Sequence, residues 1–280
     1  MKDILSEIIE HKLLEVEVQK LTISSDFLYE QVEALIAENT PRRSMKKALM
    51  DSASGIIAEF KRRSPSKGWI HRTANAAQIP AGYETSGAAA LSILTDEKFF
   101  GGCLRDICTA RPLVNIPILR KDFIIDEYQL LQARMVGADA ILLIAACLTR
   151  EQCATLTTRA HELGLEVLLE VHSSAELAYI NKEVDMVGVN NRNLGTFVTD
   201  VENSFRIAEQ LRRAVAGSVA GSPAETTCED LPLLVSESGI SHPETIRNLR
   251  AAGFRGFLMG ETFMKTEHPG EALNELIVQL

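Results

Sequence analysis

The sequence has few cysteines, and their spacing suits neither disulfides nor a metal site. Five cysteines occur in 280 residues without a CxxC motif: Cys103, Cys108, Cys147, Cys153 and Cys228. An odd number at irregular spacing predicts no disulfide framework and no zinc knuckle, so we expect reduced thiols in the cytoplasm. The six histidines form no HxH or HxxxH pair, and we therefore expect no metal site.

Long apolar runs and an excess of positive charge are also missing. No apolar run approaches the roughly 20 residues of a membrane-spanning helix, and the N-terminus carries charges every few residues, unlike a signal peptide. The formal net charge of −9 at pH 7 argues against nucleic acid or an anionic membrane as the main partner. A small anionic substrate stays compatible with that charge, because a local pocket can be positive on an acidic protein.

Residues 1–50 have the pattern of helices. In the first stretch the apolar positions recur every three or four residues: Ile4, Leu5, Ile8, Ile9, Leu13 and Leu14. A second helix is predicted from Asp26 to Glu38, and Asn39-Thr40-Pro41 should end it. We favour helices that pack on the rest of the protein over a helix that binds a partner.

From residue 55 onward the sequence alternates between strands and helices. Short apolar runs predict eight buried parallel strands: Ile56–Phe60, Ala89–Leu94, Ile116–Leu119, Ala140–Ile144, Val167–Glu170, Met186–Asn190, Leu233–Ser236 and Gly256–Met259. Amphipathic stretches lie between them, among them Asp126–Val136, Thr149–Leu163, Ser173–Asn181, Val201–Arg213 and Pro243–Ala252. This order predicts an α/β fold, a (β/α)8 TIM barrel in a single domain of residues 1–280, with residues 1–50 packing on it. A doubly wound open sheet is the alternative, but no GxGxxG follows the first strand.

One segment interrupts the alternation. Residues Ala214–Asp230 are small and polar and include glycine and proline, so they predict a loop. The loop would lead into the seventh strand, at the end of a barrel away from its chemistry.

Charged side chains end several of the predicted strands. Because side chains alternate between the faces of a strand, Glu59 and Lys61 share the face of the apolar residue before them. Lys121, Glu170 and Glu237 follow the same rule on three other strands. Barrel active sites lie at these carboxyl ends, and buried ions must be paired. The pattern fits a structural ion-pair cluster, acid–base catalysis or a lysine Schiff base at Lys121 or Lys61.

Three loops beyond the strands suit a phosphate group. Glycines allow close approach of the backbone to an anion, and the loops after the seventh and eighth strands of a barrel commonly bind phosphate. These loops begin Glu237-Ser238-Gly239-Ile240 and Met259-Gly260-Glu261-Thr262. Ser64-Pro65-Ser66-Lys67-Gly68 adds a polar loop with a cation after the first strand, although an ordinary turn would have a similar sequence. His172, near the same mouth, is expected to be structural rather than catalytic.

The longest motifs resemble those of the indole-3-glycerol-phosphate synthase family of tryptophan biosynthesis. The similarity runs from about residue 55 to the end of the chain, with the helical N-terminus resembling the family's extra segment. It is carried by Ile57–Gly68, Ala90–Glu97 with Phe99–Gly102, Leu119–Asp126, Glu170–His172, Asn190–Leu194 and Ser236–Ile240. Several motifs in the same order are far more specific than any one of them.

The resemblance implies a substrate, a reaction and a set of roles. The substrate would be 1-(2-carboxyphenylamino)-1-deoxyribulose 5-phosphate, which loses carbon dioxide and water on ring closure without a cofactor or a metal. Lys121 resembles the family's general acid, Lys61 would hold the substrate carboxylate with Glu59 orienting it, and Glu170 would stabilise the cationic nitrogen or take a proton. Asn190 and Glu237 would position hydroxyls and lysines. Binding residues would be Ser64, Phe123, Arg192, Ser238, Gly239, Gly260 and Glu261.

Two other functions are compatible with parts of the pattern. An isomerase or aldolase acting on another phosphosugar would share the phosphate loops but need a different set of strand ends. A barrel that had lost its activity would lack the charged strand ends, and these are present here. We expect a cytoplasmic monomer that takes a small phosphorylated substrate and no nucleic acid or membrane partner. Association with other enzymes of tryptophan biosynthesis stays open.

Overall fold

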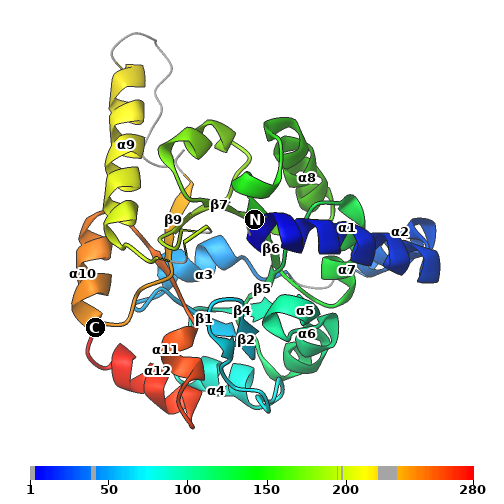
Figure 1. Ribbon diagram of the computed structural model, residues 1–280, viewed down its shortest axis with the longest axis horizontal. Coiled ribbons are helices and arrows are strands. Elements are labelled where there is room, and N and C mark those ends of the chain that lie inside the picture. The colour runs from blue at the N-terminus through cyan, green and yellow to red at the C-terminus, as the bar shows by residue number, and fades with distance from the viewer. Residues whose placement is uncertain (1–3, 39–41, 194, 197, 220–231) are drawn as a thin grey trace.

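The computed structural model describes residues 4–38, 42–193, 195–196, 198–219 and 232–280. Eight parallel strands close into a barrel that helices surround (Figure 1). The strands are β1 (Ile56–Phe60), β4 (Ala90–Leu94), β5 (Ile118–Lys121), β6 (Ala140–Ile144), β7 (Glu166–Val171), β8 (Met186–Asn190), β9 (Leu233–Glu237) and β10 (Gly256–Met259). β1 pairs with both β4 and β10, so the ring has no free edge. The predicted TIM barrel is confirmed, and the open-sheet alternative is wrong.

Helices and a short hairpin fill the connections. The hairpin of β2 (Arg63–Ser64) and β3 (Gly68–Trp69) follows β1. The helices after it are α4 (Ile79–Thr85), α5 (Glu97–Phe100), α6 (Leu104–Ala110), α7 (Glu127–Met135), α8 (Arg150–Glu162), α9 (Glu202–Val219), α10 (Pro243–Ala251), α11 (Glu261–Met264) and α12 (Pro269–Ile277). Short 3₁₀ turns are η1 (Arg111–Leu113), η2 (Ala145–Cys147) and η3 (Ser174–Tyr179).

The structure corrects three predicted boundaries. The third barrel strand is Ile118–Lys121 rather than Ile116–Leu119. It begins later because Pro117 has no N–H to donate to a neighbouring strand. It extends further because the charge of Arg120 is paired with Asp122 at 2.9 Å and can be buried. The predicted helix Ser173–Asn181 is only a 3₁₀ turn. The predicted loop Ala214–Asp230 is helical up to Val219, which the high helix propensity of its alanines favours. Residues 220–231 of that prediction lie outside the described residues.

Alternate residues of the strands belong to two separate apolar cores. Ile57, Leu119, Leu168 and Val235 lie in a core inside the barrel. Their neighbours along the strands pack outward in a second core, toward the surrounding helices. This period of two directs the side chains two positions further along toward the barrel axis, at the carboxyl ends of the strands.

The N-terminal segment contacts both ends of the barrel. It forms α1 (Ile4–Thr22), α2 (Ser25–Ala37) and α3 (Met45–Asp51). α3 closes the amino-terminal end, where Met45 and Leu49 join the core inside the barrel. α2 packs against α7, and α1 begins in front of the barrel in Figure 1. No helix among the described residues is long and apolar enough to cross a membrane.

The apolar stripe predicted for α1 is wrong in its second half. Leu13 and Leu14 are 54% and 69% exposed, whereas Lys12 is fully buried. Lys12 lies on the same helical face as the buried Ile8 and Val16, four residues to either side. Two aspartates of the barrel lie 3.0 Å from its ammonium and pair the charge that this face buries.

Candidate active site at the mouth of the barrel

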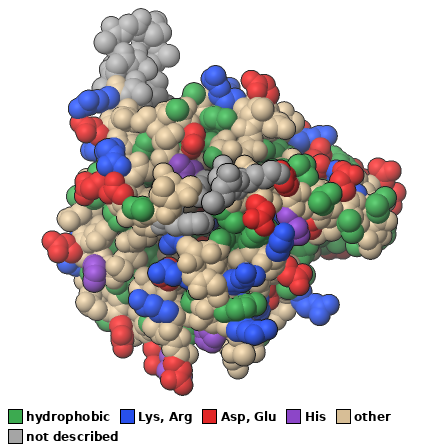
Figure 2. Space-filling view, in the orientation of Figure 1, with side chains coloured by type: hydrophobic (Ala, Val, Ile, Leu, Met, Phe, Trp, Pro, Cys, Tyr) green, Lys and Arg blue, Asp and Glu red, His purple; other side chains and the backbone are tan. Residues whose placement is uncertain are grey.

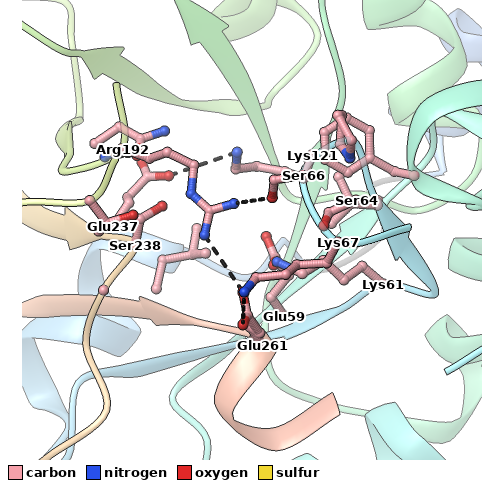
Figure 3. A pocket seen from close by; sticks show the side chains of 18 of the residues that line it. Glu59, Lys61, Ser64, Ser66, Lys67, Lys121, Arg192, Glu237, Ser238 and Glu261 are labelled. Atoms are coloured by element: carbon pink, nitrogen blue, oxygen red, sulfur yellow. Dashed lines mark hydrogen bonds and ion pairs between the residues drawn. The ribbon is translucent and has the colours of Figure 1, made fainter. Parts of the chain in front are cut away.

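A cavity of about 680 Å³ opens at the carboxyl ends of the strands. Its walls include all thirteen residues that the sequence nominated: Glu59, Lys61, Ser64, Lys121, Phe123, Glu170, Asn190, Arg192, Glu237, Ser238, Gly239, Gly260 and Glu261. Ten side chains around it are labelled in Figure 3. The cavity size and its mixture of apolar walls with convergent polar groups are typical of a small-molecule site.

The floor of the cavity holds Lys121 between two carboxylates. Its Nζ lies 3.2 Å from Glu170 Oε2 and 3.8 Å from Glu237 Oε2. Burial alone would lower the pKa of Lys121, but the two carboxylates outweigh it and raise the pKa above the usual value. Lys121 is therefore an ammonium at neutral pH, able to donate a proton but not to act as a free amine.

The surrounding charges drive the pKa values of the two carboxylates apart. Burial would raise the pKa of Glu170, but Lys121 and His172 lower it below the usual range. Burial and the charge of Glu170 raise the pKa of Glu237, with Lys121 opposing them. Two like groups whose pKa values are driven apart can divide acid and base roles between them. Glu237 fits there because Gly188 lacks a side chain: a Cβ would lie 2.1 Å from Glu237 Oε1.

A second lysine–carboxylate pair lies at the end of β1. Lys61 donates a hydrogen bond to Glu59, and both side chains line the cavity. Gly260 provides the room for this pair, since a Cβ there would lie 2.3 Å from Glu59 Oε1. The glycine predicted for phosphate approach thus borders a carboxylate.

The rim of the cavity is basic and rich in hydroxyl groups. Arg192 donates to Ser66 Oγ at 3.0 Å and lies 3.6 Å from Glu261 Oε2, while Lys67 is 3.9 Å from Glu261 Oε1 (Figure 3). Ser64 Oγ is buried without a hydrogen-bond partner among the described residues. Figure 2 shows basic side chains on the face that carries α1. The side chain of Glu261 thus pairs with Lys67 and Arg192.

Backbone geometry shapes the loop after β9. Ser238 and Gly239 have φ values of 67° and 77°, in the left-handed region that favours glycine. A Cβ on Gly239 would also lie 2.5 Å from Thr199 Cγ2. On the neighbouring strand β8, Asn190 accepts a hydrogen bond from the backbone N–H of Arg192 at 3.0 Å.

An apolar wall faces the charged floor. Phe123 and Phe100 pack with ring centroids 6.0 Å apart, and Ile4, Leu5 and Ile8 of α1 line the same cavity. The sequence nominated Phe123 but missed the others. The signal for Ile4, Leu5 and Ile8 was the apolar stripe in the first half of α1, but the stripe does not indicate which surface it covers.

A buried ion cluster joins α1 to the strand that carries Lys121. The Lys12 ammonium lies 3.0 Å from both Asp96 and Asp122 and 2.9 Å from Glu15. Asp122 directly follows Lys121, and Lys12 with Arg120 hold its pKa far below the usual range against the opposing effect of burial. Sequence reasoning missed this cluster, because an isolated lysine on a helix resembles a solvated residue.

The closed barrel and the charged cavity at its mouth place the chain among (β/α)8-barrel enzymes. Residues 5–276 match the family model described as indole-3-glycerol phosphate synthase. The indole-3-glycerol phosphate synthase of Bacteroides thetaiotaomicron is 62% identical over 99% of this chain and 98% of its own length. That of Magnetococcus marinus is 40% identical over 98% of both. The chain belongs to the indole-3-glycerol phosphate synthase family.

A solved structure shows the same fold at low sequence identity. A mutant tryptophan synthase α-subunit from Pyrococcus furiosus aligns with a TM-score of 0.55 and 14% identity. The alignment covers 81% of this chain and 96% of the other. At this identity the similarity concerns the fold alone.

Proposed function

We propose that the chain converts 1-(2-carboxyphenylamino)-1-deoxyribulose 5-phosphate into indole-3-glycerol phosphate, carbon dioxide and water. Family membership supports the reaction. The observation that carries its chemistry is the Lys121 ammonium held between Glu170 and Glu237. The apolar wall suits the aromatic ring, and the basic rim suits the phosphate.

Lys121 is the general acid of ring closure. The ring carbon that bears the carboxylate attacks the ketone carbon, and the ketone oxygen takes a proton from Lys121 Nζ. Its raised pKa supports this role over a Schiff base, which needs a neutral amine. Glu170, on the same side of the ammonium, stabilises the positive charge that develops on the anilino nitrogen.

Lys61 binds the substrate carboxylate, and Glu59 orients it through their shared hydrogen bond. Loss of carbon dioxide returns the electron pair of the breaking carbon–carbon bond to the ring. The hydroxyl formed from the ketone then leaves as water, and the adjacent carbon loses a proton, which completes the indole. Glu59, Lys61 and Glu170 all border this part of the cavity.

The phosphate occupies the rim. Ser64, Ser238, Gly239, Gly260 and Glu261 surround that end of the cavity, with Arg192 as its cation. Binding at the rim, remote from the reacting carbons, supplies energy for orientation. Phe123 packs on the substrate ring, and Asn190 and Glu237 position the hydroxyls and Lys121.

We further propose that one chain works as a single domain, a monomer in the cytoplasm. Residues of α1 line the cavity together with the ends of the barrel strands, which supports a single domain. The odd number and irregular spacing of the cysteines support a reducing compartment.

Product analysis tests the reaction. The purified protein should form indole-3-glycerol phosphate, seen by its fluorescence, together with one carbon dioxide per product. An analogue without the ring carboxylate is the control, and it should give no product. A protein that forms no indole-3-glycerol phosphate, or that instead isomerises or cleaves sugar phosphates, would rule out this function.

A further inference from the structure

His172 lies directly behind Glu170, outside the walls of the main cavity. Its Nε2 is 3.2 Å from Glu170 Oε1, and its Nδ1 is 3.6 Å from Glu176 Oε2. The other oxygen of Glu170 faces Lys121 at 3.2 Å. Glu170 therefore lies between two cationic groups, one inside the cavity and one behind it.

The backbone around His172 is fixed from two sides. Its N–H donates to Glu176 Oε2 at 2.6 Å, because η3 turns back immediately after β7. Its carbonyl accepts a hydrogen bond from Asn203 of α9 at 3.1 Å. With the main chain held in this way and the side chain 12% exposed, the imidazole has little freedom to leave the two carboxylates.

The charges around the ring favour its protonated form. Burial would lower the pKa of His172, but Glu170 and Glu176 outweigh it and raise the pKa to about 10. From η2, the half-buried Cys147 thiol faces the same carboxylates, and burial together with their charges raises its pKa. The groove on the outer side is lined by further charged groups: Arg192, Asp200 and Arg206. His172 is therefore an imidazolium throughout the neutral range.

We propose that His172 is a positioning residue of the ring-closure reaction: held by Glu176, it keeps Glu170 ionised and aimed at Lys121. Without the charge of His172, Glu170 and Glu237 would both depend on the single Lys121 ammonium, and either carboxyl group could be the protonated one. With it, the negative charge stays on Glu170 and the proton on Glu237. This inference rests on the role proposed for Glu170.

The test compares His172→Gln, which is neutral, with His161→Gln. His161 forms another histidine–carboxylate pair, 2.8 Å from Asp185, but does not line the cavity. We expect kcat of His172→Gln to fall about tenfold or more with a KM within about twofold, because only the charge behind the reacting centre changes. Loss of the cation raises the pKa of Glu170, so the acid limb of the kcat–pH profile moves to higher pH by about 1 to 3 units. His161→Gln should keep the wild-type profile.

Two results would overturn the inference. The first is an acid limb of His172→Gln that coincides with that of the wild type, whatever its thermal stability. The second result needs no variant at position 172. Nitrogen NMR of the wild-type protein, assigned with glutamine variants of the other histidines, should show His172 as an imidazolium up to pH 8.5. Titration of the His172 ring near pH 6.5 would refute the inference. If the wild-type protein turns over but the pH profile of His172→Gln is not shifted, only the role of His172 is rejected. If the wild-type protein shows no turnover, the proposed function itself is rejected.

Discussion

Substitution of Lys12 by methionine tests how α1 is held on the barrel. Methionine keeps most of the length of the side chain but removes the ammonium from Asp96 and Asp122, which are both buried. Removing one partner of a buried ion pair typically costs about 3 to 5 kcal/mol, because the remaining charges stay desolvated. We expect a loss of this size in the free energy of unfolding, measured in urea at pH 7.5.

The matched control lies on the same helix. Lys20 forms an ion pair of 2.7 Å with Asp126, but these side chains are 31% and 35% exposed. Lys20→Met should cost only about 0.2 to 1 kcal/mol, since solvent screens this pair. A Lys12→Met variant that loses no more stability than Lys20→Met would refute the importance of the buried cluster.

The loss in the free energy of unfolding caused by Lys12→Met should depend on pH. In the wild type the folded-state pKa of Asp122 is depressed, so its contribution to stability is full above the unfolded pKa and is lost as the pH falls through the folded pKa. In the variant that pKa rises, and protonation relieves the stranded charge. The difference in the free energy of unfolding between wild type and variant should therefore become smaller as the pH falls from 7.5 to 5. If α1 undocks before the barrel unfolds, limited proteolysis should cut first within residues 4–22.

Three further substitutions test the cavity. Gly188→Ala should lower kcat about 100-fold or more, because the new Cβ would displace Glu237; a kcat near the wild-type value would refute the close contact. Arg192→Ala should raise KM about tenfold and weaken inhibition by inorganic phosphate, with kcat changed far less; an unchanged KM would remove Arg192 from the phosphate site. Leu5→Asp should raise KM while the barrel stays folded by circular dichroism, and wild-type kinetics would remove α1 from the substrate wall.

The barrel and the charged floor of its mouth follow from short-range patterns in the sequence. Leu119 and Lys121, two positions apart, lie on one face because side chains alternate along a strand. The same rule brings Glu170 and Glu237 beside Lys121. Parallel strands then gather these ends at one mouth, so residues far apart in the chain meet without any long-range signal in the sequence.

Features that depend on contacts between distant segments were not predictable. Lys12 pairs with Asp96 and Asp122, which lie far away in the sequence, and the residues around Lys12 do not indicate these partners. The pairing of Glu261 with Arg192 similarly depends on two loops from different repeats. His172 could be placed near the mouth, but not between two carboxylates, because Glu176 reaches it only through the tight turn of η3.

The central claim is that Lys121 donates the proton in ring closure, and one comparison tests it most directly. Lys121→Met and the exposed-lysine control Lys47→Met are each tested for turnover and for binding of an analogue whose ketone is reduced to an alcohol. We expect Lys121→Met to bind the analogue within about tenfold of wild type while kcat falls about 1,000-fold, within the range for loss of a general acid. Lys47→Met should match the wild type in both measurements. Turnover by Lys121→Met within tenfold of the wild-type rate would contradict the account.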